Sequence, residues 1–93
     1  MNIMFLKYIL NFSSMYISII DDEQVLCKKV QKKLEREGYS VRAFFGYNDF
    51  MQNGDDMAHL YIIDISLGDG SGFDIIKWIR TTKKNHSPII ITS

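Results

Sequence analysis

Acidic residues stand directly after two short apolar runs, and this arrangement limits what the chain can become. Asp21 and Asp22 follow the run from residue 16 to residue 20, and Asp64 follows the run from 60 to 63. If both runs are buried parallel strands, their ends bring the three carboxylates to one edge of a sheet. Like charges held close together oppose one another's ionisation, so the cluster is unfavourable without a cation. Oxygen ligands suit a hard divalent cation, and we expect magnesium (Mg2+) here.

The rest of the sequence alternates between strand and helix patterns. Residues 23–37 and 73–80 place apolar side chains three or four positions apart, which is typical of helices with one buried face. Residues 39–44 alternate and residues 88–93 are largely apolar, as in strands, and a short helix is expected around residues 49–52. Strands that alternate with helices through right-handed crossovers form a parallel sheet covered on both sides. The sequence therefore predicts an α/β fold.

Particular side chains are expected to fill the buried faces of the two longer helices. They are Leu26, Val30, Leu34, Phe73, Ile76 and Ile79, with Cys27 and Ile75 beside the two stripes. We interpret Cys27 as a small core residue rather than a reactive thiol. Trp78 falls off its stripe, and we interpret it as a single exposed residue rather than a partner surface, because isolated exposed apolar residues are common. Asn48 is a candidate cap for the short helix. Residues 68–72 are expected to form a loop, since glycine permits backbone shapes closed to other residues.

Size and charge exclude several functions. The 93 residues allow one small domain, and 11 basic residues balance 11 acidic ones. This balance provides no basic surface for nucleic acid and no polybasic patch for an anionic membrane, so we expect no direct nucleic-acid binding by this chain. Cys27 is the only cysteine, which excludes an internal disulfide and suits a reducing cytoplasm. His59 and His86 form no metal-ligand pair with other candidates.

The N-terminal segment, residues 1–15, is richer in apolar side chains than a soluble tail should be. Its apolar run is interrupted by Lys7 and Asn11 and is shorter than the roughly 20 residues that span a bilayer as a helix, so we expect no membrane span. It also lacks the layout of a signal peptide. Three interpretations stay open: an unused upstream start codon with Met15 as the true start, a short helix that covers apolar surface, and a membrane-surface anchor.

Four features together identify a resemblance to a known family. They are the acid cluster Asp21-Asp22-Glu23, the spacing along the sequence between Asp22 and Asp64, the loop Leu67-Gly-Asp-Gly-Ser-Gly72, and Ser93 at the end of the run Pro88-Ile-Ile-Ile-Thr-Ser93. With these features, residues 16–93 resemble the receiver domain of two-component response regulators. Gly68 departs from the family pattern, which usually has proline at this position. The chain also stops before the fifth strand and the last two helices that such domains usually have.

The resemblance implies a flavodoxin-like doubly wound parallel sheet with strand order 2-1-3-4. Residues 16–93 would be a receiver domain that is incomplete at its C-terminal end, and residues 1–15 an extension outside the family match. The fourth strand would then be an edge of the sheet. Exposed edges favour pairing with another chain, so self-association is an expected consequence.

The resemblance also implies a role as a phosphoprotein in two-component signalling rather than as an enzyme. Asp64 would accept a phosphoryl group from a sensor histidine kinase or a phosphotransfer protein in a magnesium-dependent reaction, giving an aspartyl phosphate. Asp22 and Asp64 would bind Mg2+ directly, Asp21 through water, and Ser66 through its backbone carbonyl. Ser93 would contact the phosphoryl group. The catalytic lysine of the family has no counterpart in this sequence.

Other interpretations start from the same residues. The main alternative is an interaction fragment that occupies a kinase or a full-length regulator without being phosphorylated. A hydrolase that forms an aspartyl phosphate has less support, because Asp64-Ile-Ser66 lacks the second carboxylate that such enzymes place two residues later. A purely structural interpretation of Asp21 and Asp22 is a cap between strand and helix. An Asp64→Asn change separates phosphorylation from simple docking.

Overall fold

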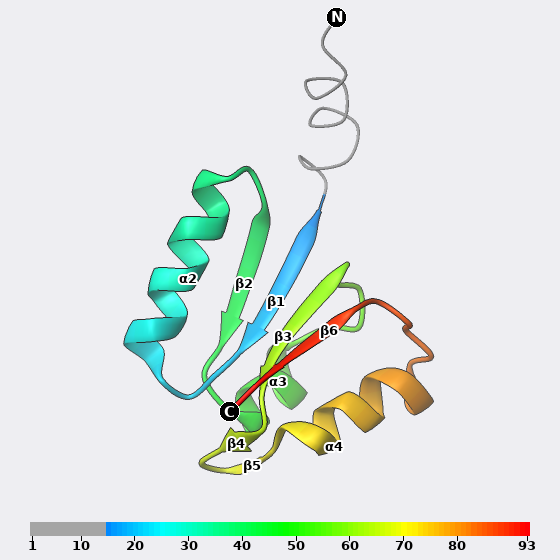
Figure 1. Cartoon of the computed structure of the whole chain (residues 1–93). Helices are drawn as coiled ribbons and strands as arrows, with labels where there is room; N and C mark the ends of the chain where they lie inside the picture. Colours follow the sequence, from blue (N-terminus) through cyan, green and yellow to red (C-terminus); the bar gives the residue numbers. More distant parts are fainter. Residues whose placement is uncertain (1–14) are drawn as a thin grey trace, which may run out of the picture.

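A parallel sheet of four strands forms the centre of the computed structural model, which describes residues 15–93 (Figure 1). The strands are β1 (Tyr16–Ile20), β2 (Ser40–Phe44), β3 (Leu60–Asp64) and β6 (Ile89–Thr92). They lie in the order β2-β1-β3-β6, and each neighbouring pair is parallel. Because β6 is the fourth of these strands along the chain, the predicted order 2-1-3-4 is confirmed. The predictions made for residues 1–14 fall outside the described residues.

Helices cover both faces of the sheet, which confirms the doubly wound architecture (Figure 1). One face carries α2 (Gln24–Arg36), and the other carries α3 (Tyr47–Asn53) and α4 (Gly72–Lys77). The chain continues from α4 into η2, a π-helical turn at Trp78–Thr82. No helix within residues 15–93 is long and apolar enough to cross a membrane.

The segment after β3 is more regular than the predicted loop. Two short strands, β4 (Ser66–Leu67) and β5 (Gly70–Ser71), pair in antiparallel fashion and form the β4–β5 hairpin. The Ser71 hydroxyl then accepts a hydrogen bond from the N–H of Phe73 at 3.1 Å and so caps α4. The hairpin therefore connects Asp64, the last residue of β3, directly to the start of α4.

Aromatic rings fill the core between the sheet and the helices α3 and α4. Phe50 is fully buried and meets three rings edge to face, with centroid separations of 5.3 Å to Phe44, 5.8 Å to Trp78 and 6.4 Å to Tyr61. Such pairs stabilise a core beyond the area that they bury. The interpretation of Trp78 as an exposed residue is therefore wrong. The ring belongs to η2, whose wider turn departs from the helical period assumed from the sequence.

The buried face of α2 confirms the prediction that Cys27 is a small core residue, but it excludes Leu26 from the predicted stripe. Cys27 is fully buried, with Val30 and Leu34 packed around it, whereas Leu26 is 49% exposed. Positions 27, 30 and 34 follow the helical repeat as well as positions 26, 30 and 34 do. The small cysteine side chain fills the position closest to the sheet, and the larger leucine stands at the margin.

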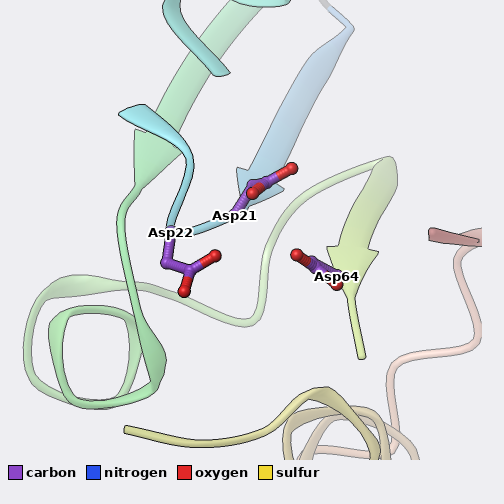
Figure 2. A group of neighbouring side chains, drawn as sticks. All are labelled: Asp21, Asp22 and Asp64. Atoms are coloured by element: carbon purple, nitrogen blue, oxygen red, sulfur yellow. The ribbon is translucent and has the colours of Figure 1, made fainter. Parts of the chain in front are cut away.

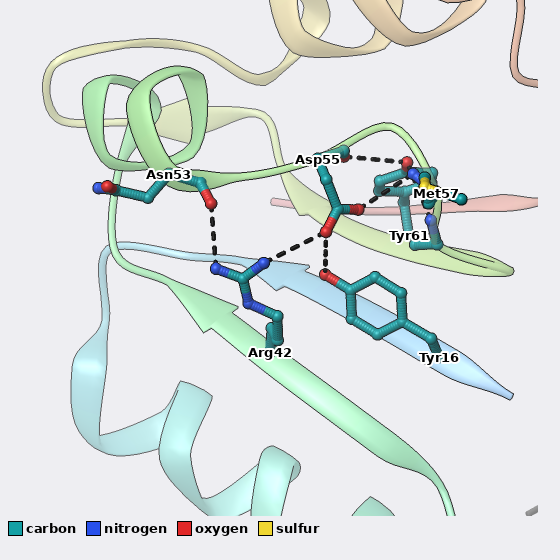
Figure 3. Close-up of polar contacts among 7 residues, drawn as sticks. Tyr16, Arg42, Asn53, Asp55, Met57 and Tyr61 are labelled. Carbon is teal, nitrogen blue, oxygen red and sulfur yellow. Dashed lines mark hydrogen bonds and ion pairs between the residues drawn. The ribbon is translucent and has the colours of Figure 1, made fainter. Parts of the chain in front are cut away.

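A polar network joins β1 and β2 to the loop before β3 (Figure 3). Asp55, in the loop before β3, accepts hydrogen bonds from Arg42 at 3.2 Å and from the Tyr16 hydroxyl at 3.3 Å. Arg42 also donates to the main-chain oxygen of Asn53 at 3.0 Å. Burial and the charge of Asp55 raise the pKa of Tyr16. The network therefore ties β1 and β2 to the end of α3.

Candidate functional site

The carboxyl ends of β1 and β3 bring together the three acidic residues predicted from the sequence (Figure 2). Ile20 of β1 pairs with Ile63 of β3, so the next residues, Asp21 and Asp64, reach the same edge of the sheet. Asp22 follows Asp21 and completes the group. Each side chain offers one carboxylate oxygen, and these oxygens all lie within 4.8 Å of one another. Residues spaced in this way can hold a single metal ion.

Main-chain N–H groups orient the three carboxylates. Asp21 and Asp64 each accept a hydrogen bond from the N–H two residues further along the chain, at 2.9 Å and 3.0 Å. Asp22 accepts one from the N–H of Gly68 in the β4–β5 hairpin, at 3.1 Å. Hydrogen bonds to a carboxylate are stronger than those between neutral groups, and each uses only one of its two oxygens. The side chains are therefore held in place while retaining ligand capacity.

The electrostatics of the group favour a cation. Burial raises the pKa of Asp21, the N–H of Glu23 acts in the opposite direction, and the charges of Asp64 and Asp22 raise the pKa further. Ionised Asp21 is thus unfavourable when nothing offsets the neighbouring negative charge. Carboxylate oxygens are ligands that Mg2+ prefers. The chemistry of the donor set therefore fits this ion.

Position 72, where the start of α4 packs against the backbone of Asp64, requires glycine. The N–H of Gly72 donates to the main-chain oxygen of Ile65 at 2.8 Å, which holds the start of α4 against the end of β3. A Cβ atom at Gly72 would overlap the main-chain oxygen of Asp64. The close approach of the two backbones leaves no room for a side chain, and it fixes the position from which Asp64 projects.

A cavity of about 210 Å3 opens beside Asp21 and Asp64. Its apolar lining consists of Ile19, Leu26, Cys27, Val30 and Ile62. Thr92, which pairs with Asp64 in the sheet, and Ser93 line the same cavity. The structure thus places Ser93 near the acidic group, and it places exposed Ser66 beside Asp64 through the N–H bond already described.

Asp69, at the turn of the β4–β5 hairpin, is a residue of this region that the sequence did not reveal. Its carboxylate accepts the N–H of Tyr47 at 2.7 Å and the N–H of Asn48 at 3.0 Å, so it caps α3 from outside that helix. These bonds hold the pKa of Asp69 below its ordinary value. The predicted cap, Asn48, is wrong, since Asn48 lies within α3. An acidic residue between two glycines suggests a turn, but it does not indicate a partner 22 positions away.

Comparisons with known proteins identify the family at the sequence level. The family described as "Response regulator receiver domain" matches residues 17–93. The transcriptional regulatory protein CssR of Bacillus subtilis is 34% identical over 77 residues, which cover 83% of this chain and 34% of that protein. The transcriptional regulatory protein GltR of Pseudomonas aeruginosa is 33% identical over 69 residues, covering 73% and 28%. The chain thus spans about a third of the length of these curated relatives.

Solved structures agree with this assignment. The BeF3-activated receiver domain of DrrB, a Thermotoga maritima response regulator, is 28% identical with a TM-score of 0.71, and the match covers 83% of this chain and 63% of that one. A two-component response regulator from Clostridium difficile is 26% identical with a TM-score of 0.73, covering 84% and 64%. The chain therefore belongs to the response regulator receiver domain family of two-component signalling systems.

Proposed function

We propose that this chain takes a phosphoryl group from a phosphohistidine of a sensor histidine kinase or a phosphotransfer protein onto Asp64. The observation that carries the proposal is the group of three carboxylates at the ends of β1 and β3, with oxygens within 4.8 Å of one another. Such a group combines a nucleophile with cation ligands at the edge of the sheet where α/β folds bind ligands. Membership of the receiver family supports the same role.

Transfer onto Asp64 needs its carboxylate in the ionised state. One carboxylate oxygen forms a bond to phosphorus while the bond between phosphorus and the histidine nitrogen breaks, and the electron pair of that bond stays on the imidazole. The products are an aspartyl phosphate and a free histidine. Such a transfer depends chiefly on alignment and on neutralised charge. The N–H of Ser66, 3.0 Å from Asp64 Oδ1, contributes to the alignment.

Four residues would hold the magnesium ion. Asp22 and Asp64 would bind it directly, Asp21 through a water molecule, and Ser66 through its main-chain carbonyl. The all-oxygen donor set and the raised pKa of Asp21 support this assignment. When bound, the ion supplies the positive charge that lets an anionic phosphoryl group approach an anionic carboxylate.

Ser93 would report on the transferred group. Its hydroxyl would donate a hydrogen bond to a phosphoryl oxygen on Asp64. Two observations support this role. Ser93 follows β6, whose last residue, Thr92, pairs with Asp64, and Ser93 and Asp64 line the same cavity. Self-association through β6 is a separate proposal, supported by Ile90 and Ile91, which are 51% and 49% exposed.

Phosphoramidate, a donor with a phosphorus–nitrogen bond like that of phosphohistidine, tests the proposal. With Mg2+ present, the intact mass of the parent protein should rise by one phosphoryl group, and chelation of the metal should prevent the rise. Asp64→Asn should gain nothing, whereas the matched variant Asp56→Asn, which changes a carboxylate outside the acidic group, should behave as the parent does. An equal gain in mass by Asp64→Asn would refute the assignment. A folded parent that gains nothing would instead favour docking without phosphorylation.

A further inference from the structure

One hydrogen bond ties the acidic group to the β4–β5 hairpin. The N–H of Gly68 donates to Asp22 Oδ2 at 3.1 Å and joins two segments that are 46 positions apart in the sequence. Asp22 is one of the carboxylates proposed to bind Mg2+ directly. The bond uses Oδ2 of Asp22 and leaves its other carboxylate oxygen available as a metal ligand. The N–H of Gly68 can therefore set the orientation of the Asp22 carboxylate relative to Asp21 and Asp64.

The identity of residue 68 matters for this bond because proline, which the family usually has at this position, carries no N–H. A chain with proline here cannot make the same contact to Asp22. Alanine can, since a Cβ atom at Gly68 would meet only Asp22 Oδ2, at 3.4 Å, which is an ordinary contact. The effect of the N–H can thus be separated from the effect of a side chain.

The opposite side of the hairpin is anchored on α3. The Asp69 carboxylate accepts the N–H groups of Tyr47 and Asn48 at 2.7 Å and 3.0 Å. Gly70 lies against the Tyr47 ring so closely that a Cβ atom there would stand 2.6 Å from Cγ of that ring. A Cβ atom at Gly46 would in turn stand 3.1 Å from Asp69 Oδ1. Charge and close packing together fix where the hairpin sits.

We propose that Gly68 and Asp69 are positioning residues of the acidic site: the N–H of Gly68 holds Asp22 in its metal-binding orientation, and Asp69 fixes the hairpin that presents this N–H. The inference rests on the proposed function. The same hairpin carries Ser66, whose N–H contacts Asp64, so one anchored element contacts both direct ligands. Groups that orient a metal ligand are typically worth about 10- to 100-fold in metal affinity.

A magnesium titration followed by NMR tests the role of the N–H. Gly68→Pro should raise the dissociation constant for Mg2+ by about tenfold, the lower end of that range. Gly68→Ala, which keeps the N–H, should bind Mg2+ as the parent does. Equal affinity of the Pro and Ala variants would overturn the proposal. A parent that binds no Mg2+ would refute the metal site itself, and with it this inference.

A second pair of variants tests the anchor without a change in the backbone. Asp69→Asn should weaken Mg2+ binding and speed hydrogen exchange at the Gly68 amide in the metal-free protein. Asp49→Asn is the matched control, because Asp49 also supports α3, and its hydrogen bonds join it to Phe45 and Asn53 rather than to the hairpin. Both variants should lower the melting temperature, whereas only Asp69→Asn should change metal affinity and exchange. Parallel effects of the two variants on affinity would show a purely structural role and overturn the proposal.

Discussion

Ser18 of β1 is fully buried, and its hydroxyl has no hydrogen-bond partner among residues 15–93. A buried polar group without a partner costs about 1–3 kcal/mol. Ser18→Ala removes the hydroxyl and should raise the free energy of unfolding by about 1 kcal/mol, measured by urea denaturation. A fall in stability would mean that the hydroxyl makes a favourable contact, for instance to a bound water molecule.

The raised pKa of Asp21 leads to a prediction of how stability depends on pH. Burial and neighbouring charges place this pKa above its ordinary value of 3.8. Below 3.8 the group is protonated in the folded and unfolded chain alike, and above the folded pKa its ionisation lowers stability. Asp21→Asn should therefore raise the melting temperature of the metal-free protein near neutral pH. The gain should shrink as the pH falls toward 3.8, and a gain that stays constant would contradict the assignment.

Single residues also show what the sequence could reveal about the site. Asp21 and Asp64 were predictable because parallel strands deliver their last residues to one edge of a sheet. Gly68 and Asp69 were not, because their partners lie far away in the sequence and depend on how the β4–β5 hairpin meets α3. A pattern along one segment carries no information about such contacts.

The helix α4 shows the same limit at the scale of an element. The predicted buried stripe includes Phe73, which is 56% exposed, whereas Ile75, which was predicted only beside the stripe, is fully buried. Ile79 of η2 is buried as predicted. Which side of a helix faces the core depends on where its first turn is held. The Ser71 cap and the contact of Gly72 with β3 decide that here.

The junction between β3 and α4 provides a stability prediction. Gly72→Ala places a methyl group against the main-chain oxygen of Asp64 and should lower the free energy of unfolding by about 2 kcal/mol, as overpacking does. Gly68→Ala, at a position with room for a methyl group, is the matched control and should stay close to the parent. Chemical denaturation of the two variants gives the comparison. Equal stability would mean that the junction relaxes easily.

At the scale of the whole molecule, the polar network and the acidic group lie in different parts of the parallel sheet. The polar network joins Tyr16, the first residue of β1, and Arg42, in the middle of β2, to Asp55 in the loop before β3 (Figure 3). The acidic group lies at the carboxyl ends of β1 and β3 (Figure 2). The sequence patterns predicted a parallel sheet covered on both sides, because right-handed crossovers restrict how alternating strands and helices can connect. The strand order itself came from the resemblance to the receiver family.

Asp55→Asn tests whether the polar network and the acidic group are independent of each other. The ion pair of Arg42 and Asp55 is partly exposed, with 50% and 35% of the side chains accessible, so its loss should cost no more than about 1 kcal/mol of stability. The dissociation constant for Mg2+ should stay unchanged, because the network makes no contact with the acidic group. Thermal melting and the NMR titration measure the two effects. Weaker metal binding in this variant would show that the network and the acidic group are coupled.

Chemical trapping of the phosphoryl group tests whether Asp64 carries it, as we propose. Borohydride reduces an aspartyl phosphate to homoserine, so peptide mass spectrometry after phosphorylation and reduction identifies the modified position. We expect homoserine at position 64 alone, and only when Mg2+ is present during phosphorylation. Homoserine at position 21 or 22, or none in a protein that has gained a phosphoryl group, would contradict the proposal.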